Sequence, residues 1–209
     1  MKIAANDALI AIDVQNDFTP GGQLAVAGGD LVIPVIQAIA PLFDHIILTQ
    51  DWHTPGHSSF ASTHAGKQPF ESIEMPYGQQ TLWPDHCVQG TPGAEFHVAL
   101  HLPQAELILR KGFRPAIDSY SAFFENDRAT ATGLASYLKE RGIERVFLAG
   151  LAYDYCVGFS ALDARRQGIP AVIVKDATRA IDLGGSVERM EAEFTAAGVQ
   201  VVDSSELSR

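Results

Sequence analysis

A cysteine lies where an apolar strand-like run gives way to a helical pattern, in the segment Gly-Leu-Ala-Tyr-Asp-Tyr-Cys-Val that ends at Val157. At a helix start the backbone N–H groups point outward and the helix dipole favours an anion, so the thiol of Cys156 is placed to become a thiolate. The same amides can stabilise an oxyanion formed when the thiolate attacks a carbonyl carbon. The segment indicates a nucleophile, with a buried structural cysteine as the alternative. Cys87 lacks this context and is expected to pack beside His86.

Two charged residues follow apolar runs directly. Asp13 comes after Ala-Leu-Ile-Ala-Ile, and Lys111 ends the run Glu-Leu-Ile-Leu-Arg-Lys. Ligands of open α/β sheets gather at the carboxyl ends of the strands, so both side chains are candidates for chemistry. Asp13 could act as a general base or cap the following turn. Lys111 could favour the anionic forms of Asp13 and a thiol, or be a solvated strand end.

A third group has the composition of a metal site. Asp51 and His53 occur as Asp-Trp-His after the second apolar run, and residues i and i+2 of an extended segment face the same side. His86 could supply a third ligand, with Ser58 or His57 as a further ligand or neighbour. A carboxylate and two imidazoles with open positions suit zinc, iron or manganese in a catalytic site. The alternative is a group of histidines that stabilises a loop by hydrogen bonds.

These side chains need a scaffold, and the apolar pattern predicts one. Six short, almost continuously hydrophobic runs are expected to form buried strands, at residues 8–12, 46–49, 107–109, 146–149, 171–174 and 199–202. Segments with helical periodicity alternate with them, at about 30–40 with Asp30 as N-cap, 132–140, 155–167 and 186–197. The alternation predicts an α/β fold: a doubly wound, mostly parallel six-stranded sheet with helices on both faces.

Residues 51–104 interrupt this alternation. The segment is rich in proline and glycine, contains six of the seven histidines, and has no convincing long element. Structureless segments of this length inside a compact domain are usually functional or disordered, and the aromatic content argues against disorder. We therefore expect one domain spanning residues 1–209, with an ordered, site-building excursion at 51–104.

Composition limits the class of protein. The 209 residues are 46% hydrophobic and 19% charged, which is ordinary for a globular protein, and the net charge of −10 argues against nucleic acid or an anionic membrane as partner. Two cysteines cannot form a disulfide framework, and no apolar run approaches the ~20 residues that span a bilayer. No signal-peptide pattern is seen at the N-terminus. We expect a cytoplasmic protein with free thiols; a homo-oligomer stays open.

Six segments, taken in chain order, resemble the nicotinamidase branch of the isochorismatase-like hydrolases. They cover residues 12–18 (Ile-Asp-Val-Gln-Asn-Asp-Phe), 51–60 (Asp-Trp-His-Thr-Pro-Gly-His-Ser-Ser-Phe), 82–91 (Leu-Trp-Pro-Asp-His-Cys-Val-Gln-Gly-Thr), 111–112 (Lys-Gly), 118–123 (Asp-Ser-Tyr-Ser-Ala-Phe) and 150–157. One such motif would be a weak signal, whereas six in family order extend over most of the chain.

The resemblance implies a role for each candidate. Cys156 would be the nucleophile, Asp13 the proton shuttle and Lys111 the cation that lowers the thiol pKa. One divalent ion, zinc before iron or manganese, would be bound by Asp51, His53 and His86, with Ser58 or His57 nearby. The resemblance also implies an oxyanion hole from the amides of Ala152 and Cys156, a cis Leu151–Ala152 peptide, and an aromatic pocket lined by Phe18, Trp83 and Tyr155, with Leu24 and Tyr120 near it.

The implied reaction is hydrolysis of a small aromatic carboxamide, nicotinamide, to nicotinate and ammonia through a thioester, with pyrazinamide also accepted. One residue departs from the family pattern: Tyr153 stands where relatives often carry Thr, and it either alters the pocket wall or points away.

Four other functions are alternatives to this one. An amidohydrolase of the same superfamily could act on a ureido or carbamoyl substrate. A dinucleotide-binding oxidoreductase is disfavoured because the first strand-to-helix turn has no G-x-G-x-x-G. An inactive binding protein is disfavoured because Asp13, Lys111 and Cys156 occur together, and isochorismate cleavage is disfavoured because that branch lacks the cysteine.

Overall fold

A six-stranded parallel sheet forms the centre of the molecule, in a computed structural model that describes residues 1–209. Its strand order is β5-β2-β1-β6-β7-β8, and every neighbouring pair is parallel. The strands are β1 (Asp7–Ile12), β2 (His45–Asp51), β5 (Leu107–Lys111), β6 (Arg145–Leu151), β7 (Ala171–Arg179) and β8 (Gln200–Val202). The predicted six-stranded, doubly wound sheet is confirmed.

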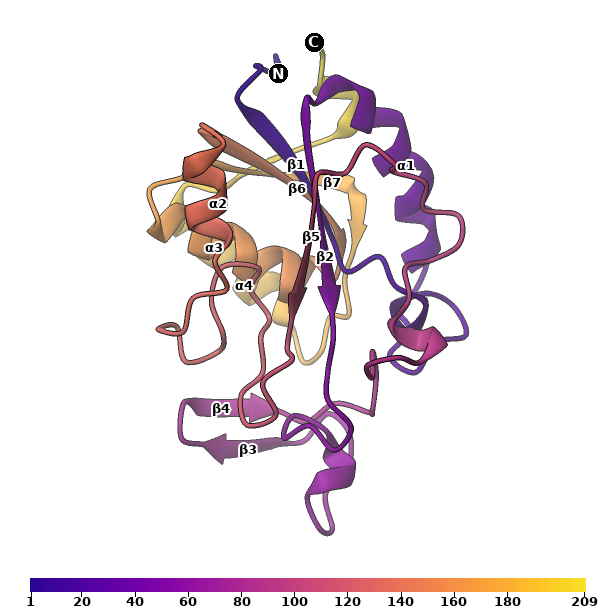
Figure 1. The fold of residues 1–209 in the computed structure, drawn as a ribbon. Helices are drawn as coiled ribbons and strands as arrows, with labels where there is room; N and C mark the ends of the chain where they lie inside the picture. The colour runs from indigo at the N-terminus through magenta and orange to yellow at the C-terminus, as the bar shows by residue number, and fades with distance from the viewer.

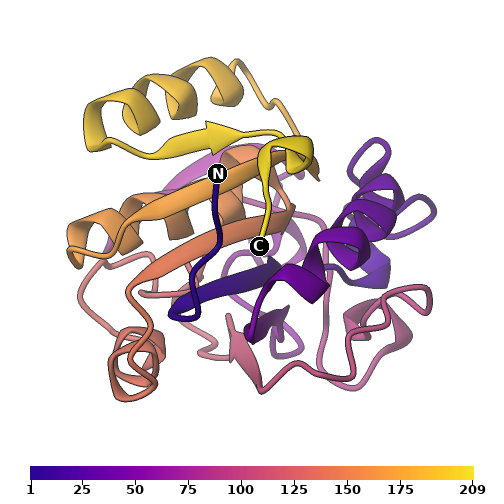
Figure 2. The ribbon, with the colours of Figure 1, turned by 90° about the horizontal axis from the view of Figure 1, so that it is seen from above.

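Helices cover both faces of this sheet. Helix α1 (Val32–Ile39) lies on one face, and α2 (Leu134–Glu140), α3 (Gly158–Arg166) and α4 (Ser186–Ala197) lie on the other (Figure 1). Viewed from above, α4 runs alongside the edge strand β8 (Figure 2). Both faces are therefore buried, which explains why the strands are almost continuously apolar.

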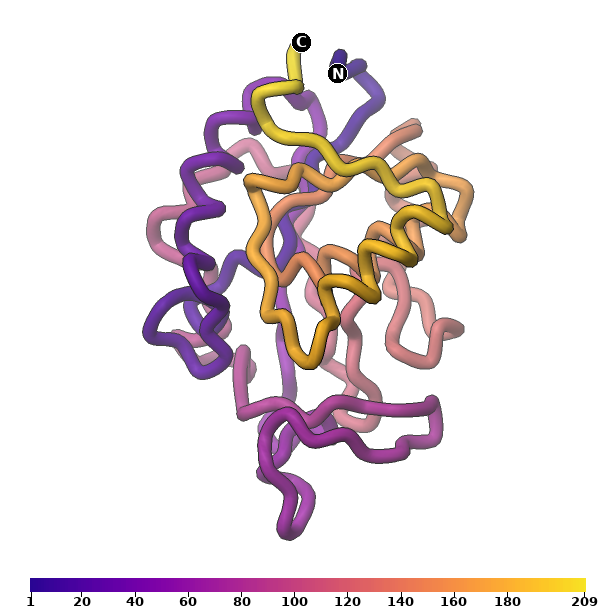
Figure 3. Tube along the Cα trace, turned by 180° about the vertical axis from the view of Figure 1, so that it is seen from behind, coloured from indigo at the N-terminus to yellow at the C-terminus, as the bar shows by residue number.

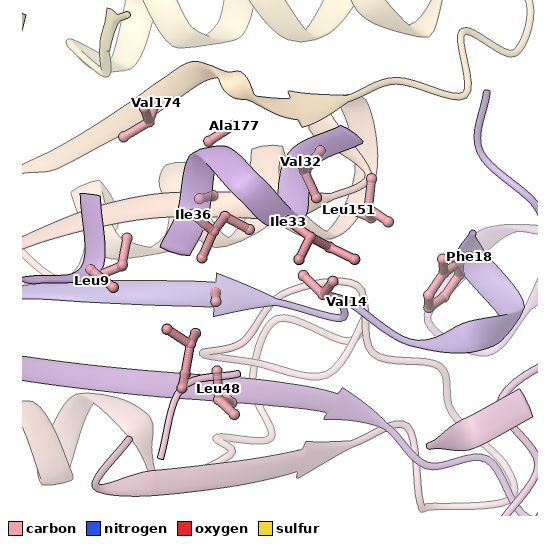
Figure 4. Packing of buried hydrophobic residues seen from close by; sticks show 14 of the residues in the cluster. Leu9, Val14, Phe18, Val32, Ile33, Ile36, Leu48, Leu151, Val174 and Ala177 are labelled. Atoms are coloured by element: carbon pink, nitrogen blue, oxygen red, sulfur yellow. The ribbon is translucent and has the colours of Figure 1, made fainter. Parts of the chain in front are cut away.

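Side chains of β1 alternate between two hydrophobic clusters. Leu9 and Ala11 belong to the cluster under α1, where Ile36 packs, while Ile10 and Ile12 belong to the cluster under α2, α3 and α4. Figure 4 shows the first cluster, with α1 lying over the strands. This packing on both faces fixes where each strand ends along the strand direction. It thereby fixes the positions of the polar residues at and after the strand ends.

The helix boundaries differ from the predicted ones at two places. The predicted N-cap role of Asp30 is wrong: a short 3-10 turn (Gly29–Leu31) precedes α1, and the chain enters it through Gly28 in the left-handed region. The helix predicted at 155–167 is divided into an irregular turn (Tyr153–Val157) and α3, because Tyr155 has non-helical dihedral angles. The predicted range 186–197 matches α4.

The excursion contains an element that the sequence did not reveal. Strands β3 (Ser72–Met75) and β4 (Gly78–Thr81) form an antiparallel hairpin beyond the carboxyl ends of β2 and β5 (Figure 1). The two termini lie together at the opposite end of the molecule, where Lys2 forms a bridge with Ser208 (Figures 1 and 3). None of the helices has the length and apolar character needed to cross a membrane.

Candidate active site

A buried lysine joins the other two predicted catalytic residues. Lys111 ends β5, where it pairs in register with Asp51 of β2, and its side chain is completely buried. Its Nζ lies 2.7 Å from Asp13 Oδ2 and 3.3 Å from Cys156 Sγ, and it also donates to Asp51 Oδ1. A further bond of 3.0 Å to the Ser119 carbonyl completes its surroundings. The solvated-strand-end alternative for Lys111 is therefore excluded.

The electrostatics of this cluster favour a proton transfer rather than a preformed thiolate. Burial raises the pKa of Asp13 to about 6 although Lys111 opposes the shift, so Asp13 is a carboxylate at neutral pH. Burial also raises the pKa of Cys156 above its usual value, again with Lys111 opposing. Burial by itself would lower the pKa of Lys111, but the charges of Asp13 and Asp51 outweigh that effect and raise the pKa above its ordinary value. The side chain therefore stays an ammonium. A thiol and a carboxylate thus share one cation.

Asp13 is held by a residue that the sequence analysis missed. Its backbone has a φ of 49°, in the left-handed region, where β1 turns away from the sheet. Thr49 Oγ1 donates to Asp13 Oδ1 at 2.6 Å and accepts the Asp13 N–H at 3.2 Å. These bonds leave Oδ2 directed at Lys111, so the orientation of the carboxylate is determined from two strands.

The end of β2 is completed by a side chain. β1 no longer pairs with β2 beyond Ala11↔Leu48, so the main-chain groups of Asp51 lack a strand partner on that side. The buried Gln15 amide replaces it: Oε1 accepts the Asp51 N–H and Nε2 donates to the Asp51 carbonyl, both at 2.8 Å. Nε2 also donates to the Ala94 carbonyl. Gln15 thereby fixes the backbone that carries the Asp51 carboxylate.

The predicted metal ligands converge. Ligand atoms of Asp51, His53 and His86, all buried, lie within 4.8 Å of one another. His53 Nε2 lies 3.1 Å from Asp118 Oδ1, which leaves its buried Nδ1 without any partner. His86 Nδ1 donates to the Pro84 carbonyl at 2.8 Å, so its Nε2 is free to bind an ion. An orphaned imidazole nitrogen beside a carboxylate is a donor set that fits a divalent cation.

Burial also adjusts the charge state of these imidazoles. Burial lowers the pKa of His86 to about 4, so the ring is neutral at physiological pH, as a metal ligand must be. For His53, burial lowers the pKa, but the hydrogen bond to Asp118 and the charge of Asp51 raise it overall. Asp118 is therefore an additional carboxylate that orients and polarises His53.

The two further ligand candidates differ in availability. Both ring nitrogens of His57 are hydrogen-bonded, to Ser59 Oγ and to the Arg114 carbonyl, each at 2.8 Å. Ser58 Oγ is buried and has no partner. Of the two, Ser58 has the free donor atom, and His57 packs its ring against His53 at 4.6 Å between centroids.

One cavity contains all five predicted pocket residues. Its lining includes Asp51, His86, Ala152 and Cys156 together with the aromatic and apolar residues Phe18, Leu24, Trp83, Tyr120, Tyr155 and Ile181. Trp83 meets Tyr155 edge-on at 4.9 Å between centroids, and its Nε1 donates to the Tyr120 hydroxyl at 3.1 Å. The cavity is an aromatic slot with the thiol and the metal-ligand group among its walls.

The cysteine turn is fixed by another buried carboxylate, that of Asp154. The Leu151–Ala152 peptide is cis, in agreement with the expectation. In the irregular turn that follows, Asp154 accepts the N–H groups of Ile181 and Asp182 at 2.9 and 2.8 Å, and the Ser186 hydroxyl. Asp154 therefore ties the loop carrying Ile181 to the turn carrying the thiol.

Tyr153 points away from the cavity. Its ring packs against Phe194 of α4, and its hydroxyl lies 3.0 Å from Glu191 Oε1. Lys175 Nζ lies 3.6 Å from the ring centroid. Of the two expectations for this residue, the structure supports the one in which the pocket wall is unaffected.

Comparison with known proteins places the chain in a family. The model of the Isochorismatase domain matches residues 7–206. The chain belongs to the isochorismatase family. Across 98% of its length, this isochorismatase-family chain is 57% identical to a nicotinamidase from Acinetobacter baylyi, covering 95% of that protein.

Solved structures agree with this assignment. An Acinetobacter baumanii nicotinamidase/pyrazinamidase superimposes with a TM-score of 0.96 and 53% identity, covering 97% of this isochorismatase-family chain and 98% of the other. A Pyrococcus horikoshii pyrazinamidase in complex with zinc superimposes with a TM-score of 0.76 and 35% identity, covering 95% and 99%.

Five residues that matter to the site geometry were missed: Gln15, Thr49, Gln80, Asp118 and Ile181. Two of them, Gln15 and Asp118, lie inside the motifs that carry the family resemblance, so that signal was present in the sequence. The other three reach the site through long-range contacts that no local pattern displays.

Proposed function

We propose that this chain is a metal-dependent cysteine amidohydrolase that converts nicotinamide to nicotinate and ammonia. The observation that carries the proposal is the contact of one buried ammonium, Lys111 Nζ, with Asp13, Asp51 and Cys156 at an aromatic slot. The 57% identity to a nicotinamidase supports the choice of substrate.

The chemistry follows from this cluster. Lys111 Nζ lies 2.7 Å from Asp13 Oδ2 and 3.3 Å from Cys156 Sγ, so carboxylate and thiol face one cation and Asp13 is placed to take the thiol proton. The Cys156 sulfur attacks the carboxamide carbon, and the amides of Ala152 and Cys156 stabilise the oxyanion. Asp13 returns the proton to the departing ammonia as the C–N bond breaks, and water then hydrolyses the thioester. One oxyanion donor is worth ~3 kcal/mol of barrier, or about 100-fold in rate.

We propose that two parts of the slot orient the pyridine ring of the substrate. Phe18, Trp83 and Tyr155 contact its faces and edges, with Leu24 and Tyr120 at the border. Asp51, His53 and His86 would hold one divalent ion, with zinc proposed first because a zinc complex of a pyrazinamidase relative is known. When bound, the ion supplies a Lewis acid for the pyridine nitrogen, directly or through water.

The proposal extends to the setting of the enzyme. Residues 1–209 are proposed to form one hydrolase domain that works in the cytoplasm on small aromatic carboxamides, pyrazinamide included. The net charge of −10 supports small molecules rather than nucleic acid or an anionic membrane as partners.

Ammonia release from nicotinamide, measured before and after thiol alkylation, tests the function. We expect release by the zinc-loaded protein, loss on alkylation, and no turnover by Cys156→Ala, which should keep its metal content. Near-normal activity of Cys156→Ala would exclude the thioester route. Absence of release with metal supplied would favour a ureido or carbamoyl substrate.

A further inference from the structure

A buried glutamine on the unpredicted hairpin contacts two parts of the site at once. Gln80 of β4 is completely buried, whereas its neighbour Gln79 is exposed. The Gln80 Nε2 lies 2.7 Å from the Thr81 carbonyl, 3.0 Å from Asp118 Oδ2 and 2.9 Å from the Tyr120 hydroxyl. Its Oε1 accepts from Tyr77 and from Asn126, each at 3.1 Å.

The first contact reaches the metal-ligand group. Asp118 uses Oδ1 for His53 Nε2 and for the Ser119 N–H, and uses Oδ2 for Gln80. Gln80 therefore supports the one carboxylate that sets which nitrogen of His53 faces Asp51 and His86. Such outer partners of metal-ligating histidines determine ring orientation and affinity.

The second contact reaches the aromatic wall. The Tyr120 hydroxyl accepts from Gln80 Nε2 and from Trp83 Nε1, so Gln80 shares an acceptor with a ring that lines the slot. Asn126 reinforces the arrangement, because it donates to Gln80 and accepts the Tyr120 N–H at 3.0 Å. The Gln80 amide thus contacts Asp118, which holds the metal-ligand candidate His53, and Tyr120, which holds the Trp83 ring.

We propose that Gln80 is a positioning residue that holds Asp118 and Tyr120 at a fixed separation, and so sets the distance between the metal ligands and the aromatic wall. A hairpin that served only packing could bury an apolar residue here, whereas an amide with five polar neighbours has a defined orientation. The inference rests on the proposed function for its substrate but not for its metal.

The test compares Gln80→Leu with Gln79→Leu, which alters the exposed neighbour on the same strand. Gln80→Leu should weaken zinc binding and raise KM for nicotinamide, each about tenfold or more. At saturating zinc and substrate kcat should stay within about threefold, because Gln80 touches none of Asp13, Lys111 and Cys156. Gln79→Leu should keep all three values within about twofold of the parent.

Zinc affinity is measured by titrating the metal-free protein in competition with a chelating dye, and KM by ammonia release. Unchanged zinc affinity and KM in Gln80→Leu would overturn the proposal, as would a fall in kcat with KM unchanged. If Gln80→Leu does not fold, Gln80→Asn, which retracts the amide by one methylene, carries the same expectations. Failure of the parent to release ammonia would refute the nicotinamide proposal alone, since the zinc titration still decides the role of Gln80.

Discussion

The Asp13 carboxylate illustrates how individual residues control this site. Burial raises its pKa to about 6, while Lys111 and Thr49 favour the charged form. Because protonated Asp13 cannot take the thiol proton, kcat/KM should be full above this pKa and fall as the pH drops below about 6. Thr49→Val removes a hydrogen bond to the carboxylate and should move this acid limb to higher pH. A pH profile of kcat/KM, recorded for the parent and for Thr49→Val, measures the acid limb of each. An acid limb at the same pH in both proteins would contradict its assignment to Asp13.

A second prediction at the scale of one residue concerns Lys111. Its removal in Lys111→Met leaves two buried carboxylates, Asp13 and Asp51, facing each other without a cation. We expect a loss of about 3–5 kcal/mol in the free energy of unfolding, together with loss of turnover. Denaturant unfolding measures the first. The exposed Lys175–Glu191 pair is the control, and Lys175→Met should cost no more than about 1 kcal/mol.

At the scale of elements, the end of β2 depends on a side chain rather than on a neighbouring strand. Gln15→Leu should leave the Asp51 N–H and C=O buried without partners, at a cost of about 1–3 kcal/mol for each group. Gln50 is the matched control, because it also donates to the Ala94 carbonyl but leaves the Asp51 main chain untouched. Equal destabilisation of Gln15→Leu and Gln50→Leu in denaturant unfolding would show that the Asp51 contacts contribute nothing.

The elements that were predicted correctly are those with a local signal. The six strands were recognised because both faces of the sheet are covered, although β2 and β5 extend into the polar residues Asp51 and Lys111. The hairpin was missed because its exposed positions are polar and only Gln80 of β4 is buried. For the same reason the sequence located Asp13 directly after β1 and His53 shortly after β2. It did not locate Thr49, which donates to Asp13, or Gln80, which donates to the Asp118 partner of His53.

At the scale of the whole molecule, the proposed ion should stabilise the folded state because its ligands come from distant segments. Asp51 ends β2, His53 follows that strand, and His86 lies beyond the hairpin, so the unfolded chain cannot present them together. Zinc at about 1,000 times its Kd should add about 4 kcal/mol of stability, which a chelator should remove. Thermal unfolding with and without zinc measures the shift. His86→Ala should lose this response, and a zinc-independent melting temperature in the parent would count against the site.

The placement of the two termini has a practical consequence. They lie together at the amino ends of the parallel strands, and the slot opens among residues at the carboxyl ends (Figures 1 and 3). A chain attached to a bead or electrode through either terminus would present its slot to the surrounding solution. An electrode that reports nicotinamide through the ammonia released by the proposed reaction could therefore be built on this protein without rearranging its sequence.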